Sequence, residues 1–307
     1  MNSASNSEIA IDWTPKRAVY TRTQDAGPAA LEQSWAYGDA LADVSANDIW
    51  RGIIEIDGAP VATVQTVEKR LPGGLILVRL TRGPVLAQPG LLSDIVYAIR
   101  ADYPRFSRNL LFWMPDTADP APVMRRIGKR PMTTGYTTAW LDLRPEPEIL
   151  RANLRGKWRN ALAQAETTPP KVHLDQRGRE TEDFIAEYLR DRRSRKYSGP
   201  SAALVRAIAG AFARDVFLLQ ATDHGDVIAS SLFLRHGRSA TYFLSWTTDH
   251  GRERNAAHYL MWDGIERLRK AGVHWLDLGG MDARAPGVAR FKMGVGANPV
   301  TASGTWF

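Results

Sequence analysis

The chain has 307 residues, of which 44% are apolar and 24% charged, and its formal net charge is +7. These values are ordinary for a globular protein, and the length exceeds what one compact core usually holds, so we expect two domains. The sequence contains no cysteine, which excludes disulfides, thiolate metal sites and a cysteine nucleophile.

The N-terminal twenty residues begin with a polar stretch, which we expect to be disordered. They lack the charged and apolar regions of a signal peptide. No segment approaches eighteen consecutive apolar residues, so we expect no membrane span and a cytoplasmic location.

Charge is distributed unevenly along the chain. Residues 1–150 hold 16 Lys/Arg and 17 Asp/Glu, whereas residues 151–307 hold 24 and 16. A basic half indicates a polyanionic partner such as a nucleic acid, a phosphate group or an anionic membrane surface, although a merely soluble basic protein has the same balance.

Apolar periodicity and turn residues predict the elements of the first half. A helix is expected at 31–41, a hairpin from 53–56 and 61–67, and a helix at 91–99. Further strands are expected at 75–80, 110–114 and 136–143. The Pro- and Glu-rich segment 144–148 predicts a domain boundary.

The second half repeats this order. Helices are expected at 149–166, 181–196, 202–212 and 254–270, with a short helix from Pro286. Strands are expected at 216–221, 227–235, 240–246 and 273–278, and a last one near 300–306. In the first of these helices Trp158 is predicted to be core, while Arg155, Lys157 and Arg159 are predicted to form a solvated face.

The repeated order predicts a duplicated α/β (α+β) fold, with two domains that each have a mixed sheet flanked by helices. We place the domains at 21–145 and 146–307, the second being basic and catalytic. The strand–helix–strand crossovers at 75–114 and 242–278 are expected to be parallel and right-handed.

One stretch combines a strand, a glycine pair and a short helix. The strand ends at Asp277, followed by Gly279 and Gly280, whose backbone N–H groups can meet a ligand closely. The helix carries Arg290 and Lys292, the last charges before the closing strand. This is the expected place for chemistry.

Several motifs together resemble the Fem family. They are Gln33-Ser-x-x-Tyr37, Arg82-Gly-Pro84, Lys157-Trp-Arg-Asn-x-Leu-x-x-Ala165, Asp277-Leu-Gly-Gly280 and Gly287-Val-Ala-Arg-Phe-Lys-x-Gly-x-Gly296. The resemblance implies two GNAT-like domains and transfer of an amino acid from aminoacyl-tRNA to an amine. It implies no cofactor, and it places Trp35 and Arg82 among the substrate-binding residues.

Two departures concern the substrates. Family members that act on nucleotide-linked cell-wall precursors have a lysine soon after the Gln/Trp stretch, but no basic residue lies between Gln33 and Arg51. The acceptor therefore stays open, as an amine of a peptide or small molecule. Residues 252–257 resemble a degraded pyrophosphate loop of acyl-CoA-dependent GNAT enzymes, with Asn255 in place of the first glycine.

Aminoacyl transfer requires an oriented amine, a stabilised oxyanion and a proton for the leaving ribose oxygen. Lys292 is the candidate for the charged part, against a structural role as the partner of Asp277. Asp277 either orients Lys292 or acts as a general base. The N–H groups of Gly279 and Gly280 either serve the oxyanion or merely form a tight turn.

Other candidates bind substrate. The run Arg190–Lys196 is either a solvated face or a contact for tRNA phosphates, and the resemblance implies substrate contact for Arg193 or Arg195. Tyr242 and Trp246 lie on one expected strand face, either in the core or stacking on the terminal adenine. The six histidines show no metal-ligand spacing.

These observations predict an aminoacyl-tRNA-dependent aminoacyltransferase. Two alternatives remain: an acyl-CoA-dependent N-acyltransferase, and a catalytically inactive RNA- or peptide-binding module. The donor distinguishes the first two, and turnover distinguishes both from the third.

Overall fold

The computed structural model describes residues 8–88, 90–103, 108–117, 119–281 and 285–307. The chain forms two compact units. The first comprises Met1–Tyr136 together with Thr301–Phe307, and the second comprises Thr137–Val300. The division thus falls nine residues before the predicted one.

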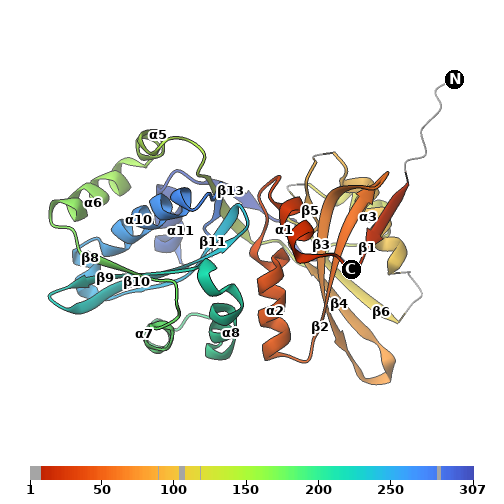
Figure 1. Ribbon diagram of the computed structural model, residues 1–307, viewed down its shortest axis with the longest axis horizontal. Helices are drawn as coiled ribbons and strands as arrows, with labels where there is room; N and C mark the ends of the chain where they lie inside the picture. Colours follow the sequence, from red (N-terminus) through yellow and green to blue (C-terminus); the bar gives the residue numbers. More distant parts are fainter. Residues whose placement is uncertain (1–7, 89, 104–107, 118, 282–284) are drawn as a thin grey trace. The chain divides into compact units, whose positions relative to one another are not determined.

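The first unit is built on a mixed sheet in the order β1-β2-β3-β4-β6, with β5 paired to β3 (Figure 1). Only β4 and β6 among these described pairs run parallel. Its strands are β1 (Ile9–Asp12), β2 (Asp48–Ile56), β3 (Ala59–Arg70), β4 (Ile76–Thr81), β5 (Val85–Leu86) and β6 (Asn109–Met114). Its helices are α1 (Arg17–Gln24), η1 (Leu31–Gln33), α2 (Trp35–Val44), η2 (Pro72–Gly74), α3 (Leu92–Asp102) and α4 (Ala121–Arg126).

The second unit has a seven-stranded sheet in the order β13-β7-β12-β11-β10-β9-β8. Its strands are β7 (Thr137–Asp142), β8 (Lys171–Asp175), β9 (Val216–Asp223), β10 (Asp226–His236), β11 (Ser239–Thr247), β12 (Trp275–Asp277) and β13 (Asn298–Thr301). Its helices are α5 (Pro147–Ala152), α6 (Gly156–Thr167), α7 (Thr181–Arg195), α8 (Ala202–Phe212), η3 (Ala213–Asp215), α9 (Asp249–Glu253), α10 (Ala256–Lys270) and α11 (Pro286–Gly294).

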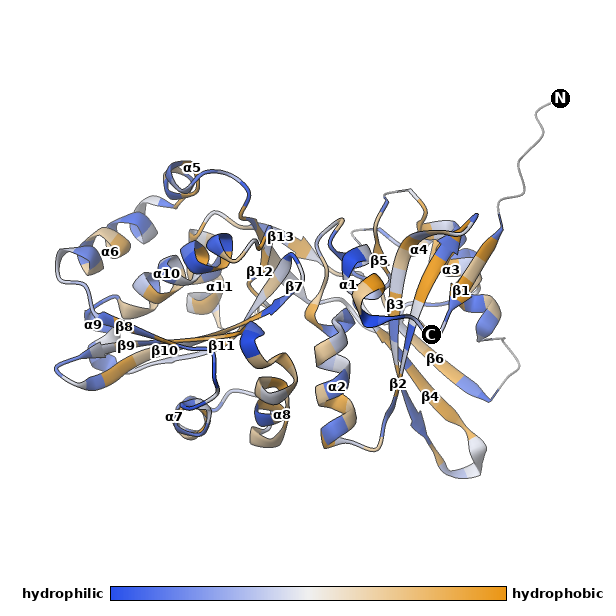
Figure 2. Ribbon diagram, in the orientation of Figure 1, coloured by the Kyte–Doolittle hydropathy of each residue, from blue (hydrophilic) through white to orange (hydrophobic). Residues whose placement is uncertain are grey.

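Helices cover both faces of the second sheet. In Figure 1, α5, α6, α10 and α11 lie on one face, and α7 and α8 lie on the other. The apolar core of the first face joins residues of α6 and α10 to Leu219, Phe233 and Leu276 of the sheet. Of the two helices on the opposite face, α7 is hydrophilic over most of its length and α8 is more apolar (Figure 2).

The predicted internal duplication is confirmed in the sheet cores. Each unit contains an antiparallel meander, a helix and a strand parallel to the last strand of that meander. The parallel pairs are β4 with β6 and β11 with β12. The expected mixed α/β fold is therefore present twice.

The two halves differ in their last strand. The predicted strand 136–143 is β7, and it pairs with β12 of the second sheet because Ala139, Leu141 and Leu143 pack in the second core. The first core instead takes in Trp306, whose backbone bonds to Trp113. The end of the chain thus supplies the first unit with the contact that β7 supplies to the second.

Two further predictions need correction. The N-terminal twenty residues were expected to be disordered, but β1 pairs with β2 and α1 packs on β3, while residues 1–7 lie outside the described ranges. The helix expected at 149–166 is broken between Ala152 and Gly156, where the N–H of Arg155 bonds to the carbonyl of Gly294.

Candidate active site

Asp277 holds the turn that follows β12. Its side chain is fully buried, and its Oδ1 accepts hydrogen bonds from Thr138 Oγ1 at 2.5 Å and from the N–H of Gly279 at 2.8 Å. Gly279 has φ of 72°, which side chains other than glycine rarely adopt. The carboxylate therefore fixes the direction in which the chain leaves the strand.

Lys292 reaches this turn from α11. Its side chain is 8% exposed, and Nζ donates to the carbonyl of Gly280 at 2.8 Å. Burial lowers the pKa of Lys292 to about 8, and the negative charge of Asp277 partly opposes this shift. The structure thus brings Lys292, Asp277, Gly279 and Gly280 together, as the sequence predicts.

An aromatic cluster anchors α11. The Phe291 ring lies 6.0 Å from that of Trp158 and 5.1 Å from that of His258, between ring centroids. Burial lowers the pKa of His258 to about 4, so its imidazole is neutral at physiological pH. Trp158 is buried, as predicted, and it packs on Gly294 two residues beyond Lys292.

The parallel strands separate beside this lysine. Ser239–Thr241 pairs with Trp275–Asp277, after which β12 ends and β11 continues to Thr247. In the described part of the chain, the remaining residues of β11 pair with β10 alone. The separation leaves the glycine turn and Lys292 at the end of the sheet, where ligands bind in open α/β sheets.

Tyr242 and Trp246 lie on opposite faces of the sheet, so the prediction of a shared face is wrong. A bulge places Tyr242 opposite Phe233 but Leu244 opposite Leu232. One extra residue reverses the alternation of side chains. The Tyr242 ring packs on Phe233 in the core, at 5.2 Å between centroids, and Trp246 is 6% exposed.

The predicted cationic contacts lie on exposed helix surfaces. Arg193 and Arg195 are both exposed on α7, and Arg195 forms an ion pair with Asp191 at 2.7 Å. Arg290 is exposed on α11, one residue before the aromatic anchor of that helix.

In the first unit, Arg82 and Trp35 have structural contacts. Arg82 is 3% exposed and pairs with Asp116 at 2.8 Å and with Glu32 at 3.6 Å. The guanidinium of Arg51 lies over the Trp35 ring, with its Cζ 4.3 Å from the ring centroid, and Tyr20 packs beside the same ring. Arg82 is therefore almost closed to a ligand, whereas Trp35 is half-buried.

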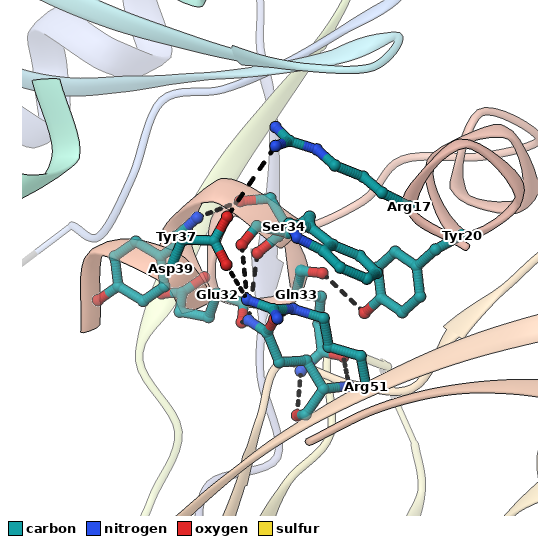
Figure 3. Close-up of polar contacts among 10 residues, drawn as sticks. Arg17, Tyr20, Glu32, Gln33, Ser34, Tyr37, Asp39 and Arg51 are labelled. Carbon is teal, nitrogen blue, oxygen red and sulfur yellow. Dashed lines mark hydrogen bonds and ion pairs between the residues drawn. The ribbon is translucent and has the colours of Figure 1, made fainter. Parts of the chain in front are cut away.

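The motif that contains Trp35 also anchors α2 to the first sheet (Figure 3). Gln33 Nε2 donates to the carbonyls of Gln65 and Thr81, and Gln33 Oε1 accepts from the N–H of Gln65. Arg51 donates to Asp39 and to Gln65 Oε1. Because the buried amides of Gln33 and Gln65 find their partners within this network, the motif has a fold-stabilising role.

Metal-binding clusters and membrane-spanning helices are both absent from the described ranges. No group of three or more His, Cys, Asp or Glu residues there is placed to hold a metal ion. No described helix combines the length and apolar character needed to cross a bilayer.

Sequence reasoning missed Thr138 and His258 as parts of this site. Thr138 stands on a strand that the sequence assigns to the other domain, so its contact with Asp277 was not foreseeable. His258 lies on α10, with its ring centroid 5.0 Å from that of Trp158, and helical spacing alone does not reveal that neighbour.

Comparisons with known proteins show what the second unit resembles. Residues 150–297 match the model of the acetyltransferase (GNAT) domain family, and a search of curated proteins found no match. The second unit therefore resembles a GNAT domain, and the repeated sheet gives the chain a duplicated GNAT-like fold.

Several solved structures resemble this fold over nearly the whole chain. FemX has the same fold with a TM-score of 0.81 at 12% identity, over 97% of this chain and 96% of that chain. The C-terminal domain of a putative lysylphosphatidylglycerol synthetase from Agrobacterium fabrum gives 0.56 at 12%, over 95% and 92%. A tandem GNAT protein from the clavulanic acid biosynthesis pathway gives 0.54 at 14%, over 98% of each chain. The Fem-like resemblance is therefore confirmed at the level of the fold.

Proposed function

We propose that the protein transfers an amino acid from aminoacyl-tRNA to an amine of a peptide or small molecule, forming an amide. The observation that carries this proposal is Lys292, a buried ammonium held at the glycine turn of a GNAT domain by the Gly280 carbonyl. The Fem-like fold and motifs support an aminoacyl donor. The name of a second neighbour, a lysylphosphatidylglycerol synthetase, also denotes an aminoacylated product.

In the proposed reaction the acceptor nitrogen attacks the carbonyl carbon of the ester. A C–N bond forms, the C–O bond to the ribose breaks, the amine loses a proton and the ribose oxygen gains one. The ammonium of Lys292 stabilises the developing oxyanion or gives the leaving oxygen its proton. A lysine whose pKa is about 8 can donate a proton near neutral pH and regain it readily.

We assign Asp277 to positioning rather than to base catalysis. Its side chain is fully buried, and Oδ1 already accepts from Thr138 and from Gly279. These contacts stabilise the turn whose next carbonyl, that of Gly280, orients Lys292. The Gly279 N–H is likewise committed to Asp277, so its part in an oxyanion site would require that bond to change.

An acyl-CoA donor is the second candidate, because the matching family is one of acetyltransferases. The loop at 252–257 weighs against it. Asn255 donates to Gln164 Oε1 at 3.0 Å, and Arg252 bonds to Thr247 and Asp249. Arg254 donates to Thr168 and pairs with Asp223 at 3.5 Å. The polar side chains of this loop are therefore occupied within the protein.

The decisive experiment compares donors. Labelled aminoacyl-tRNA is incubated with the protein and a panel of amines, and amide formation is measured with and without ribonuclease and coenzyme A. We expect transfer that ribonuclease abolishes and coenzyme A does not affect. Turnover with acetyl-CoA and none with charged tRNA would overturn the proposal in favour of the second candidate. Binding of RNA without any transfer would favour the inactive binding module.

A further inference from the structure

Two of the five cations in the basic run at the end of α7 are paired with acids. Arg190 pairs with Glu187 at 2.5 Å, and Arg195 pairs with Asp191 at 2.7 Å. Arg192 donates to the carbonyls of Gly199 and Pro200. Ions already paired with acids release few counterions on binding a polyanion, so Arg190 and Arg195 are poorly suited to phosphates.

A second group of cations lies on α6 and α11 and has no such acids. Arg155, Lys157 and Arg290 are exposed, and none of them forms a side-chain hydrogen bond or ion pair with any residue that the structure describes. Arg159 is also exposed and donates only to the carbonyls of Ala152 and Leu154. Its positive charge therefore has no acidic partner in the described ranges.

The segments that carry these cations contain no acidic residues. Residues 149–165 contain four Lys/Arg and no Asp or Glu, and residues 285–307 contain two Lys/Arg and no Asp or Glu. The acid that follows the first segment, Glu166, is taken up by an ion pair with Arg151. Glu148, on the preceding helix, is the exposed acid closest in sequence.

The start of α6 and the end of α11 are in contact. The N–H of Arg155 bonds to the Gly294 carbonyl at the end of α11, at 2.9 Å, and Phe291 packs against Trp158 of α6. Lys292 follows Arg290 by two residues on the same helix. Arg290 therefore lies on the helix that carries the proposed catalytic lysine, and the other cations lie at the start of the helix that it contacts.

We propose that this α6–α11 surface, defined by Arg155, Lys157, Arg159 and Arg290, binds the phosphate backbone of the tRNA donor. The inference rests on the proposed function and names which part of the basic unit contacts the nucleic acid. Phosphate contacts there would hold the aminoacylated end of the tRNA near Lys292, because such contacts fix register and orientation. The α7 run, by contrast, is a solvated helix face.

Two triple variants with the same change in net charge provide the test. One is Arg155→Gln, Lys157→Gln and Arg290→Gln on the proposed surface. The other is Arg190→Gln, Arg193→Gln and Arg195→Gln on α7. Binding of deacylated bulk tRNA is measured from low to moderate salt, and transfer from charged tRNA is measured in parallel. Melting temperatures verify that both variants fold.

We expect the α6–α11 variant to weaken tRNA binding roughly tenfold or more in 0.1 M salt and to lower the slope of log affinity against log salt by about two to three. The α7 variant should change the slope by less than about one. Arg159 is left intact because its bonds to the carbonyls of Ala152 and Leu154 tie α6 to the end of α5.

The opposite ranking, with the slope lost in the α7 variant and kept in the α6–α11 variant, would overturn this inference while leaving the proposed function standing. Sedimentation with anionic vesicles that depends on the α6–α11 cations, without tRNA binding, would also overturn it. Failure of the proposed function is distinct, because the unaltered protein would then transfer nothing from charged tRNA.

Discussion

Thr138 and Asp277 are joined by a hydrogen bond of 2.5 Å between two fully buried side chains that lie 139 residues apart in sequence. Thr138 belongs to β7 and Asp277 to β12, which pair antiparallel. Asp277 in turn holds the N–H of Gly279, and the next carbonyl orients Lys292. The hydroxyl of Thr138 is therefore linked to Lys292 through the carboxylate of Asp277 and the Gly279–Gly280 turn.

Thr138→Val removes this donor with almost no change of shape. A hydrogen bond to a charged group contributes about 1.5–3 kcal/mol, and we expect the free energy of unfolding to fall by about that amount. Turnover should fall as well, since the Gly279–Gly280 turn loses one of its restraints. Chemical denaturation and initial rates of transfer measure the two effects.

Thr138→Ser is the matched control, because serine keeps the hydroxyl. It should restore turnover nearly to the level of the unaltered protein. Equal loss in the Val and Ser variants would show that the hydroxyl alone does not account for the role of Thr138.

Lys292→Met tests the proposed catalytic charge. One well-placed donor to an oxyanion contributes roughly 3 kcal/mol, so turnover should fall on the order of a hundredfold. Stability at pH 7 should not fall, because burial of the ammonium opposes folding, as its lowered pKa indicates. A variant that unfolds early, with normal activity per folded molecule, would identify Lys292 as a structural partner of Asp277.

The pH dependence of the rate reports the protonation of Lys292. If the charged form is required, the rate is level below pH 7 and falls about tenfold per pH unit well above a pKa of about 8. Lys292→Arg keeps its charge throughout this range and should lose the alkaline fall in any residual activity. Rates are corrected for spontaneous hydrolysis of the ester. A rate that rises through pH 8 would instead indicate that neutral Lys292 is a base.

The same pKa affects stability with a defined sign. The folded pKa, about 8, is below the ordinary value of 10.5, so the native state binds fewer protons than the unfolded state between these values. The contribution of Lys292 to stability therefore rises with pH across that window, by roughly 3 kcal/mol at most. Unfolding of the protein and of Lys292→Met at pH 7.5 and 10 measures it. A difference between the two proteins that does not change with pH would contradict the lowered pKa.

The sequence predicted the parts of the site that lie on adjacent elements. A short apolar strand, two glycines and a proline-initiated helix are local patterns, and they placed Asp277, Gly280 and Lys292 together correctly. Contacts that depend on register were missed. The bulge at Phe243 reverses the face of Tyr242 relative to Trp246, and the sequence carries no local signal for an extra residue in one strand.

The sequence of α7 itself indicates that part of its basic run forms ion pairs. Glu187 with Arg190 and Asp191 with Arg195 are three and four residues apart, the spacings at which helical side chains form ion pairs. On α6 the corresponding positions around Lys157 hold no acid. Residue spacing does not reveal which sheet β7 joins, because a strand with alternating apolar and polar residues fits either sheet.

Gly294 tests whether the aromatic anchor positions Lys292. A Cβ at Gly294 would lie 2.4 Å from Trp158 Cδ1, and real Cβ contacts are essentially never that short. Gly294→Ala should therefore displace Trp158 or the end of α11, and overpacking of this kind costs about 1–3 kcal/mol. A Cβ at Gly287, on the same helix, would meet nothing within 4 Å, so Gly287→Ala should be neutral or stabilise by up to about 1 kcal/mol. We expect the Gly294 variant to lose both stability and turnover, because Lys292 lies two residues away, and the Gly287 variant to keep both.

Melting temperatures and initial rates of transfer of the two variants test this expectation. Full activity in a destabilised Gly294 variant would show that the lysine reaches the glycine turn without this anchor.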